Sequence, residues 1–197
     1  MESSRASREG SLDLLFMNRA LFLDRDGVIN QDNGYTFKLS DLRILNGVIE
    51  GLQAIGRLKY KIIIITNQSG IARGLFKENE FHKFMKKLTE VLAENEILIC
   101  DYFYCPHHID GIIKEFSRLC KCRKPHPGMI FEARDKHDID LSQSILIGDK
   151  VSDIKAGIAA DIPNNIIISD SPMNQELPAV ACAKDLVEAA NIILSLK

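Results

Sequence analysis

The 197-residue chain lacks a hydrophobic run approaching the roughly 20 residues of a membrane-spanning helix, so we expect no membrane association. It also lacks a dominant charge: 25 basic and 27 acidic residues give a formal net charge of -2. That balance argues against a nucleic acid or an anionic membrane as the main partner. The apolar stretch from Leu12 to Met17 is interrupted by Asp13 and is too short for a signal-peptide core, so we expect a cytoplasmic protein.

Cysteine is scarce and odd in number. Five cysteines in a chain without an export signal argue against a disulfide framework. Cys100 and Cys182 stand among apolar residues, and we predict that they are small core residues. The other three cysteines are clustered in one part of the sequence.

The length predicts one domain with a full hydrophobic core. Residues 1–17 are predicted to be a disordered or flexible extension, with Met17 as an alternative native start to Met1. Residues 18–197 are predicted to form the single domain, and we expect a monomer.

Hydrophobic periodicity predicts strands that alternate with helices. Short apolar runs predict strands before Asp24 and at 61–67, 97–104, 144–149 and 165–169. Helical spacing predicts helices at 41–59, 77–96, 129–137, 151–160 and 184–196, and residues 105–128 are predicted to be irregular. This alternation indicates an α/β fold, a Rossmann-like parallel sheet sandwiched by helices.

Polar side chains follow three of the predicted strands. Asp24 and Asp26 end the first strand, Thr66 and Asn67 the second, and Asp149 a later one. The carboxyl ends of parallel strands line a common crevice, where oxygen ligands suit Mg²⁺.

Each of these motifs also has a plain structural interpretation. Asp-x-Asp-Gly and the run from Thr66 to Gly70 are composed of turn formers. Arg123 and Lys124 resemble a solvated surface pair, and Asp153 stands where an acid stabilises a helix N-terminus.

Four soft or borderline metal ligands stand at the two ends of the irregular segment. Cys105 and His107 lie at its start, and Cys120 and Cys122 lie near its end. A tetrahedral Zn²⁺ site within about residues 105–124 is therefore predicted. His108 is the alternative imidazole. Four protein ligands leave no coordination position for water, which indicates a structural zinc ion. The sequence predicts no basic recognition helix, which argues against a nucleic-acid-binding zinc finger.

The chain resembles the haloacid dehalogenase (HAD) superfamily in the order of four motifs. These are Asp-x-Asp-Gly, a strand that ends in Thr-Asn, a lysine, and Gly-Asp-x-x-x-Asp. The resemblance implies a Mg²⁺-dependent phosphatase without a large cap domain. It makes Asp24 the nucleophile, Asp26 the acid and base, and Thr66 and Lys124 the holders of the phosphoryl oxygens. It implies a Mg²⁺ site of Asp24, Asp149 and the main-chain carbonyl of Asp26, with Lys150 and Asp153 in support.

Longer runs resemble the heptose-bisphosphate phosphatases of that superfamily. They are Thr66 to Gly74, Cys105 to His108 and Cys120 to Met129, together with the Asp24 motif. This resemblance implies removal of the C7 phosphate of a heptose bisphosphate through an aspartyl-phosphate, in the route to ADP-heptose for lipopolysaccharide or surface glycans. Substrate contacts are implied for a set of loop residues: Asp32, Asn33, Gly34, Tyr35, Asn67, Gln68, Ser69 and Arg123.

Two other functions stay open at this point. Histidinol-phosphate phosphatases share the nucleophile motif and a similar zinc loop. A catalytically silent zinc-binding interaction module is the second, although the intact set of Asp24, Asp26, Lys124 and Asp149 argues against it.

Overall fold

The structure is a computed structural model, and it describes residues 18–169 and 180–196. The prediction for residues 1–17 lies outside the described residues. Within the described part, six parallel strands form one sheet in the order β3-β2-β1-β4-β5-β6. The strands are β1 (Ala20–Leu23), β2 (Lys61–Asn67), β3 (Ile99–Cys105), β4 (Ile145–Gly148), β5 (Asn164–Ile168) and β6 (Val180–Ala183).

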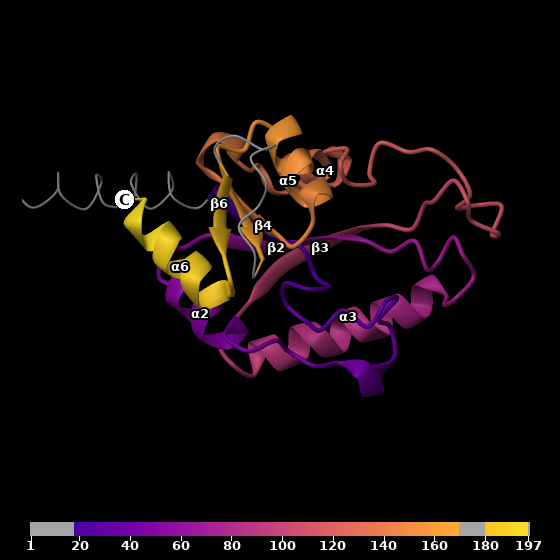
Figure 1. Ribbon diagram of the computed structural model, residues 1–197, viewed down its shortest axis with the longest axis horizontal. Coiled ribbons are helices and arrows are strands. Elements are labelled where there is room, and N and C mark those ends of the chain that lie inside the picture. Colours follow the sequence, from indigo (N-terminus) through magenta and orange to yellow (C-terminus); the bar gives the residue numbers. More distant parts are fainter. Residues whose placement is uncertain (1–17, 170–179, 197) are drawn as a thin grey trace, which may run out of the picture.

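Helices cover both faces of the sheet (Figure 1). The helices α2 (Val48–Gly56), α3 (Glu78–Ala93) and α6 (Leu186–Ser195) lie on one face, and α4 (Gly128–His137) and α5 (Val151–Ala159) lie on the other. Short 3-10 turns occur at Leu39–Asp41 and Leu141–Gln143. The predicted α/β sandwich is confirmed.

The central strands are apolar without interruption because each face of the sheet has its own core. Leu21 and Leu23 of β1 pack with α2, α3 and α6, whereas Ala20 and Phe22 pack with α4 and α5. The alternate residues of β2 divide in the same way. A strand buried on both faces therefore shows no polar alternation.

The predicted helix over 41–59 is wrong in its first half. Helix α2 begins only at Val48, after Gly47 with φ +79°. The residues before it are held extended, because Ile44 bridges Asn30 and the Leu45 N–H donates to the Ile29 carbonyl. Pairing with the loop after β1 thus overrides the helical pattern.

Two further predictions need correction. Strand β6 was missed, because its four residues, Val-Ala-Cys-Ala, are too few and too small to stand out as a strand. Cys100 and Cys182 are exposed rather than buried, since both lie on the outermost strands of the sheet, β3 and β6.

The irregular segment between β3 and α4 extends beyond the sheet edge (salmon in Figure 1). It returns to the sheet at Lys124-Pro125, which is a cis peptide bond. None of the helices in residues 18–169 and 180–196 combines the length and the apolar character that a bilayer crossing requires.

Candidate active site

A pocket of about 370 Å³ opens at the carboxyl ends of β1 and β2 and the N-terminus of α5. Strand β1 is the point where the strand order reverses, and open α/β sheets bind ligands at that point. The lining includes residues from several distant segments: Asp24, Asp26, Asp32, Gly34, Tyr35, Thr66, Asn67, Gln68, Ser69, Arg123, Lys124, Lys150, Ser152 and Asp153.

A buried lysine joins two of the carboxylates. The Lys124 Nζ atom lies 2.8 Å from Asp24 Oδ1 and 2.7 Å from Asp153 Oδ1, and it also donates to the Ile65 carbonyl at 2.8 Å. All three charged side chains are almost fully buried. Burial alone would lower the pKa of Lys124, but Asp24 and Asp153 outweigh it and raise the pKa above its usual value. Lys124 therefore stays a cation at the floor of the pocket.

A third carboxylate completes an acidic cluster. One oxygen from each of Asp24, Asp149 and Asp153 fits within 4.8 Å of the others. Burial, followed by the charge of Asp24, raises the pKa of Asp149 to about 7. The buried Asp149 Oδ1 has no hydrogen-bond partner among the described residues, so it is an oxygen ligand without a donor. These features fit a divalent cation such as Mg²⁺.

Gly27 allows Asp149 to approach the first strand. Its φ is +85°, and a Cβ atom there would collide with the Asp149 carboxylate. A glycine is therefore needed for both conformation and space.

Lys150 pairs with the rim of the pocket instead of offering a ligand atom. Its Nζ atom lies 3.5 Å from Asp149 Oδ2 and 3.2 Å from Asp32 Oδ2. Its main-chain N–H donates to Asp153 Oδ2 at 2.9 Å. Asp153 therefore caps α5, as the structural interpretation predicted, and its other carboxylate oxygen pairs with Lys124.

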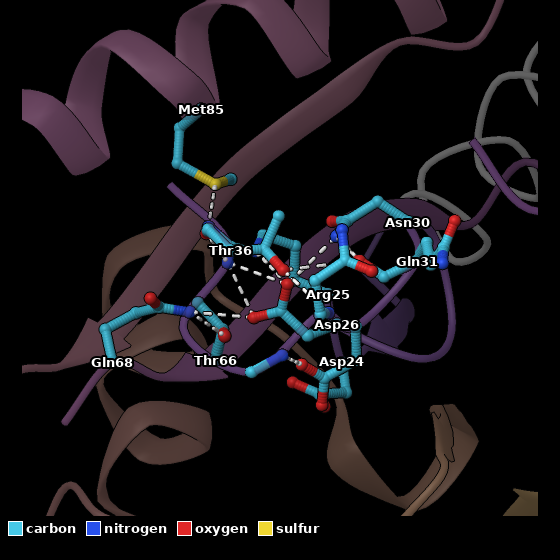
Figure 2. A network of polar contacts seen from close by, with 12 residues as sticks. Asp24, Arg25, Asp26, Asn30, Gln31, Thr36, Thr66, Gln68 and Met85 are labelled. Atoms are coloured by element: carbon cyan, nitrogen blue, oxygen red, sulfur yellow. Dashed lines mark hydrogen bonds and ion pairs between the residues drawn. The ribbon is translucent and has the colours of Figure 1, made fainter. Parts of the chain in front are cut away.

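Asp26 is held by three donor side chains (Figure 2). The buried Arg25 approaches it with Nη2 at 2.6 Å from Oδ2 and Nε at 3.1 Å from Oδ1. Asn30 Nδ2 donates to Oδ1 at 2.9 Å, and Gln68 Nε2 donates to Oδ2 at 3.1 Å. The Asp26 side chain still reaches the pocket surface.

The end of β2 contributes a hydroxyl with one hydrogen to spare. Thr66 Oγ1 accepts from Gln68 Nε2 at 2.8 Å, so its own hydrogen remains to bind an anionic oxygen. The Asn67 side chain is occupied, since it exchanges hydrogen bonds with the main-chain N–H and carbonyl of Lys124. Asn67 and Gln68 thus position Lys124, Thr66 and Asp26, while Ser69 lies on the pocket wall.

The turn after β1 forms the mouth of the pocket. Asp32, Gly34 and Tyr35 line it, whereas Asn33 lies outside the lining with its main-chain N–H donating to Thr36 Oγ1. Arg123 also lines the pocket, next to Lys124 in the sequence.

Sequence reasoning missed three residues of this site. Arg25 and Asn30 hold Asp26, and Ser152 lines the pocket at the start of α5. An arginine between two aspartates at the exit of a buried strand is a detectable pattern, because a charge there needs a partner. Nothing in the sequence distinguishes Ser152 from an ordinary residue of a first helical turn.

The four predicted soft ligands come together. One ligand atom from each of Cys105, His107, Cys120 and Cys122 lies within 4.8 Å of the others. The Cys105 Sγ atom is 3.1 Å from Cys122 Sγ and 3.5 Å from Cys120 Sγ, and His107 Nδ1 is 3.3 Å from Cys122 Sγ. The cluster could hold a metal ion, and its donors suit zinc. His108 lies apart from it, next to Arg73 and Asp110.

One thiol of this cluster is prepared to ionise. The hydrogen bond between Cys122 and Cys105 is the main reason that the pKa of Cys122 is lowered to about 5, while the pKa of Cys105 is raised. His107 Nε2 lies 2.9 Å from Arg118 Nη2. A metal ion on Nδ1 requires a hydrogen on Nε2, so Arg118 must move aside when the ion binds.

Comparison with known proteins places this geometry in context. Residues 19–178 match the polynucleotide kinase 3 phosphatase family. The D-glycero-beta-D-manno-heptose-1,7-bisphosphate 7-phosphatase of Escherichia coli (strain K12) is 40% identical over 76% of this chain and 78% of its own. The corresponding protein of Haemophilus influenzae is 39% identical over 92% of this chain and 100% of its own. The D-glycero-alpha-D-manno-heptose-1,7-bisphosphate 7-phosphatase of Photorhabdus laumondii is 48% identical over 76% and 82%.

Solved structures share the fold. A HAD-like phosphatase from Mesorhizobium loti superposes with a TM-score of 0.82, at 29% identity over 91% of this chain and 86% of its own. The D,D-heptose 1,7-bisphosphate phosphatase from B. bronchiseptica, complexed with magnesium and phosphate, gives a TM-score of 0.75 at 26% identity, over 91% and 99%.

Proposed function

The chain belongs to the polynucleotide kinase 3 phosphatase family and is a HAD-superfamily phosphatase, and we propose that it removes the C7 phosphate of D-glycero-D-manno-heptose 1,7-bisphosphate. One observation carries the chemistry. Lys124 bridges Asp24 and Asp153 in the pocket, and the neighbouring Asp149 has a buried oxygen without a hydrogen-bond partner among the described residues. We further infer a monomeric cytoplasmic enzyme that acts on a small phosphorylated sugar.

The first half-reaction transfers the phosphoryl group to Asp24. A carboxylate oxygen of Asp24 bonds to phosphorus as the bond to the C7 oxygen breaks. Lys124 Nζ and the free hydroxyl hydrogen of Thr66 hold the phosphoryl oxygens. Asp26 donates a proton to the departing C7 oxygen, which leaves as an alcohol.

The second half-reaction returns the nucleophile. Asp26 takes a proton from water, the water oxygen bonds to phosphorus, and the bond to Asp24 breaks to release phosphate. Mg²⁺ would be held by Asp24, Asp149 and the main-chain carbonyl of Asp26, with Asp153 and Lys150 in support, and it would neutralise the charge that accumulates on the phosphoryl group.

Recognition of the sugar is assigned to the pocket mouth. Asp32, Gly34, Tyr35 and Arg123 line the same pocket as Lys124. Arg123 is the cation suited to the C1 phosphate that the product retains. Ser69 and the main chain around Asn33, Asn67 and Gln68 complete the contacts in this proposal.

The second metal of the proposal is a structural Zn²⁺ ion bound by Cys105, His107, Cys120 and Cys122. The close approach of three sulfur atoms and one imidazole nitrogen supports it. Because Arg123 and Lys124 follow Cys122 directly, an ordered cluster would fix both cations at the pocket.

The experiment is phosphate release from the alpha and beta anomers of heptose 1,7-bisphosphate and from histidinol phosphate, with Mg²⁺ present. We expect preference for the heptose, with a 31P spectrum that keeps the C1 phosphate and loses the C7 phosphate. Comparing anomers matters because the E. coli relative is named for beta and the Photorhabdus relative for alpha. Preference for histidinol phosphate, or loss of the C1 phosphate, would refute the assignment.

A further inference from the structure

Arg25 is a buried charge for which the mechanism above has no task. Its side chain is 0% exposed, deep between the strand exit and α3. Arginine is among the residues least often buried without a partner, because its charge loses hydration. The guanidinium must therefore be fully engaged by its surroundings.

The contacts of the guanidinium leave it little freedom. Nε and Nη2 face Asp26 side by side, Nη2 also donates to the Thr36 carbonyl at 2.7 Å, and Nη1 points to the Met85 sulfur (Figure 2). The plane lies over the Phe84 ring, with Cζ 4.7 Å from the ring centroid. A planar fork held on its edges and on a face is a rigid support.

This support determines where the Asp26 carboxylate points. Arg25 reaches both carboxylate oxygens, whereas Asn30 and Gln68 reach one oxygen each. A carboxylate on a strand exit would otherwise rotate about χ1 and χ2, away from the leaving oxygen. Through the Thr36 carbonyl, the same guanidinium is also joined to the end of the turn at the pocket mouth.

We propose that Arg25 is a positioning residue: it fixes the Asp26 carboxylate for proton transfer at the C7 oxygen and does not itself touch the substrate. This inference rests on the proposed phosphatase function. The bonds that form and break are those of the first half-reaction. The proton moves from an Asp26 oxygen to the C7 oxygen, as the bond from phosphorus to the C7 oxygen breaks and the bond from phosphorus to Asp24 forms. Arg25 keeps its protons throughout.

The test uses two phosphomonoesters that differ in their need for that proton. The heptose bisphosphate releases an alkoxide, which needs protonation, whereas p-nitrophenyl phosphate releases a phenolate that leaves without it. We expect Arg25→Lys, which keeps the charge and loses the planar fork, to lower kcat for the heptose bisphosphate about 100-fold with little change in KM. The first turnover of p-nitrophenyl phosphate should keep its wild-type rate and appear as a burst equal to the enzyme concentration.

The burst is expected because Asp24 still attacks normally, while activation of water by the displaced Asp26 becomes slow. A readout of this kind separates positioning from a general structural role. If Arg25→Lys folds poorly, Arg25→Met removes the charge and fills the aromatic surroundings, and it should show the same split.

Leu88→Val is the matched control, because Leu88 is buried on the same helix as Phe84 and forms no part of the Asp26 network. It should lower the unfolding midpoint and leave both rates unchanged. A sugar kcat within about twofold of wild type in folded Arg25 variants, or equal losses of the first-turnover rate for the two esters, would overturn the proposal.

The outcome for Arg25 is separable from the outcome for the substrate. If the wild-type chain ignores the heptose bisphosphate and hydrolyses histidinol phosphate, the substrate assignment fails. The role of Arg25 is then decided by comparing the effects of the Arg25 variants on histidinol phosphate, used as the alkoxide ester, and on p-nitrophenyl phosphate.

Discussion

At the scale of single residues, the pocket is an arrangement of charges that do not cancel locally. Asp24, Asp149 and Asp153 lie together, with Lys124 between two of them and Lys150 at the edge. Burial raises the pKa values of Asp149 and Asp153, and the charge of Asp24 adds to the effect. Three carboxylates held close together suit a divalent cation, and the buried Lys124 cation suits the oxygens of a phosphoryl group.

Replacing the nucleophile tests the proposed chemistry directly. Asp24→Asn keeps the size of the side chain but removes the attacking charge, so we expect phosphate release to fall by at least about 1,000-fold. Circular dichroism should show an unchanged fold. Asp135→Asn, at an exposed site on α4, is the control and should retain full activity. Unchanged turnover in Asp24→Asn would defeat the assigned mechanism.

The pH dependence of magnesium binding follows from Asp149. Its pKa of about 7 without metal means that a proton competes with Mg²⁺ below pH 7. Calorimetric titration should therefore show roughly tenfold tighter Mg²⁺ binding at pH 8 than at pH 6. Asp149→Asn should remove most of the affinity at both values, and an affinity independent of pH would contradict the prediction.

The same shift has a consequence for stability. A carboxyl group whose pKa is raised on folding favours the folded state below its unfolded pKa and loses that contribution as the pH rises through its folded pKa. The metal-free chain should therefore become less stable between about pH 4 and pH 7 through this group, and Mg²⁺ should restore stability above pH 7.

At the scale of elements, the segment between β3 and α4 has no regular structure, and the Cys/His cluster joins its two ends. Long loops without secondary structure usually serve a function or lack order. Here the chain leaves Cys122 and delivers Arg123 and Lys124 to the pocket within two residues. The order of the loop and the position of Lys124 in the pocket are therefore coupled.

Removing one thiol ligand should separate zinc binding from folding of the sheet. We expect Cys122→Ser to lose the bound zinc, to expose residues 106–121 to rapid hydrogen exchange, and to lower kcat by about 10- to 100-fold through misplacement of Lys124. Metal analysis of the wild-type chain should give one zinc per chain. Cys100→Ser, an exposed cysteine outside the cluster, should keep zinc and activity.

At the scale of the whole molecule, the strand order β3-β2-β1-β4-β5-β6 places β1 between β2 and β4. Their carboxyl ends therefore bring Asp24, Thr66 and Asp149 to one edge, from positions up to 125 residues apart along the printed sequence. Both faces of these strands are buried, so the site stands on a rigid support.

A core substitution tests how much the packing of these strands contributes to the free energy of unfolding. Leu146→Ala in β4 removes a fully buried side chain from the α4 and α5 face and should lower the free energy of unfolding by about 2 to 5 kcal/mol. Leu194→Ala on α6, at a half-exposed site, should cost about 0.5 kcal/mol or less. Urea denaturation checks both, and equal losses would contradict the proposed packing.

The parallel sheet, the alternation of most of its strands and helices, and the charged residues of the site could all be predicted from the sequence alone. Buried parallel strands require apolar runs such as 61–65, and a strand exit requires turn residues. Both features can therefore be recognised from short stretches of the sequence. The two clusters were predictable for the same reason, because their members stand in short motifs at strand ends and loop ends.

The contacts that these residues make could not be predicted from the sequence and became clear from the folded structure. It shortened α2, paired β6 with β5 and left Cys100 and Cys182 exposed, because each outcome depends on neighbours distant in sequence. In the folded chain, the Asn67 side chain forms hydrogen bonds with the main chain of Lys124. The Asp26 carboxylate accepts hydrogen bonds from Arg25, Asn30 and Gln68. A hydrogen-bond partner is selected by position and direction in space, and spacing along a chain does not encode either.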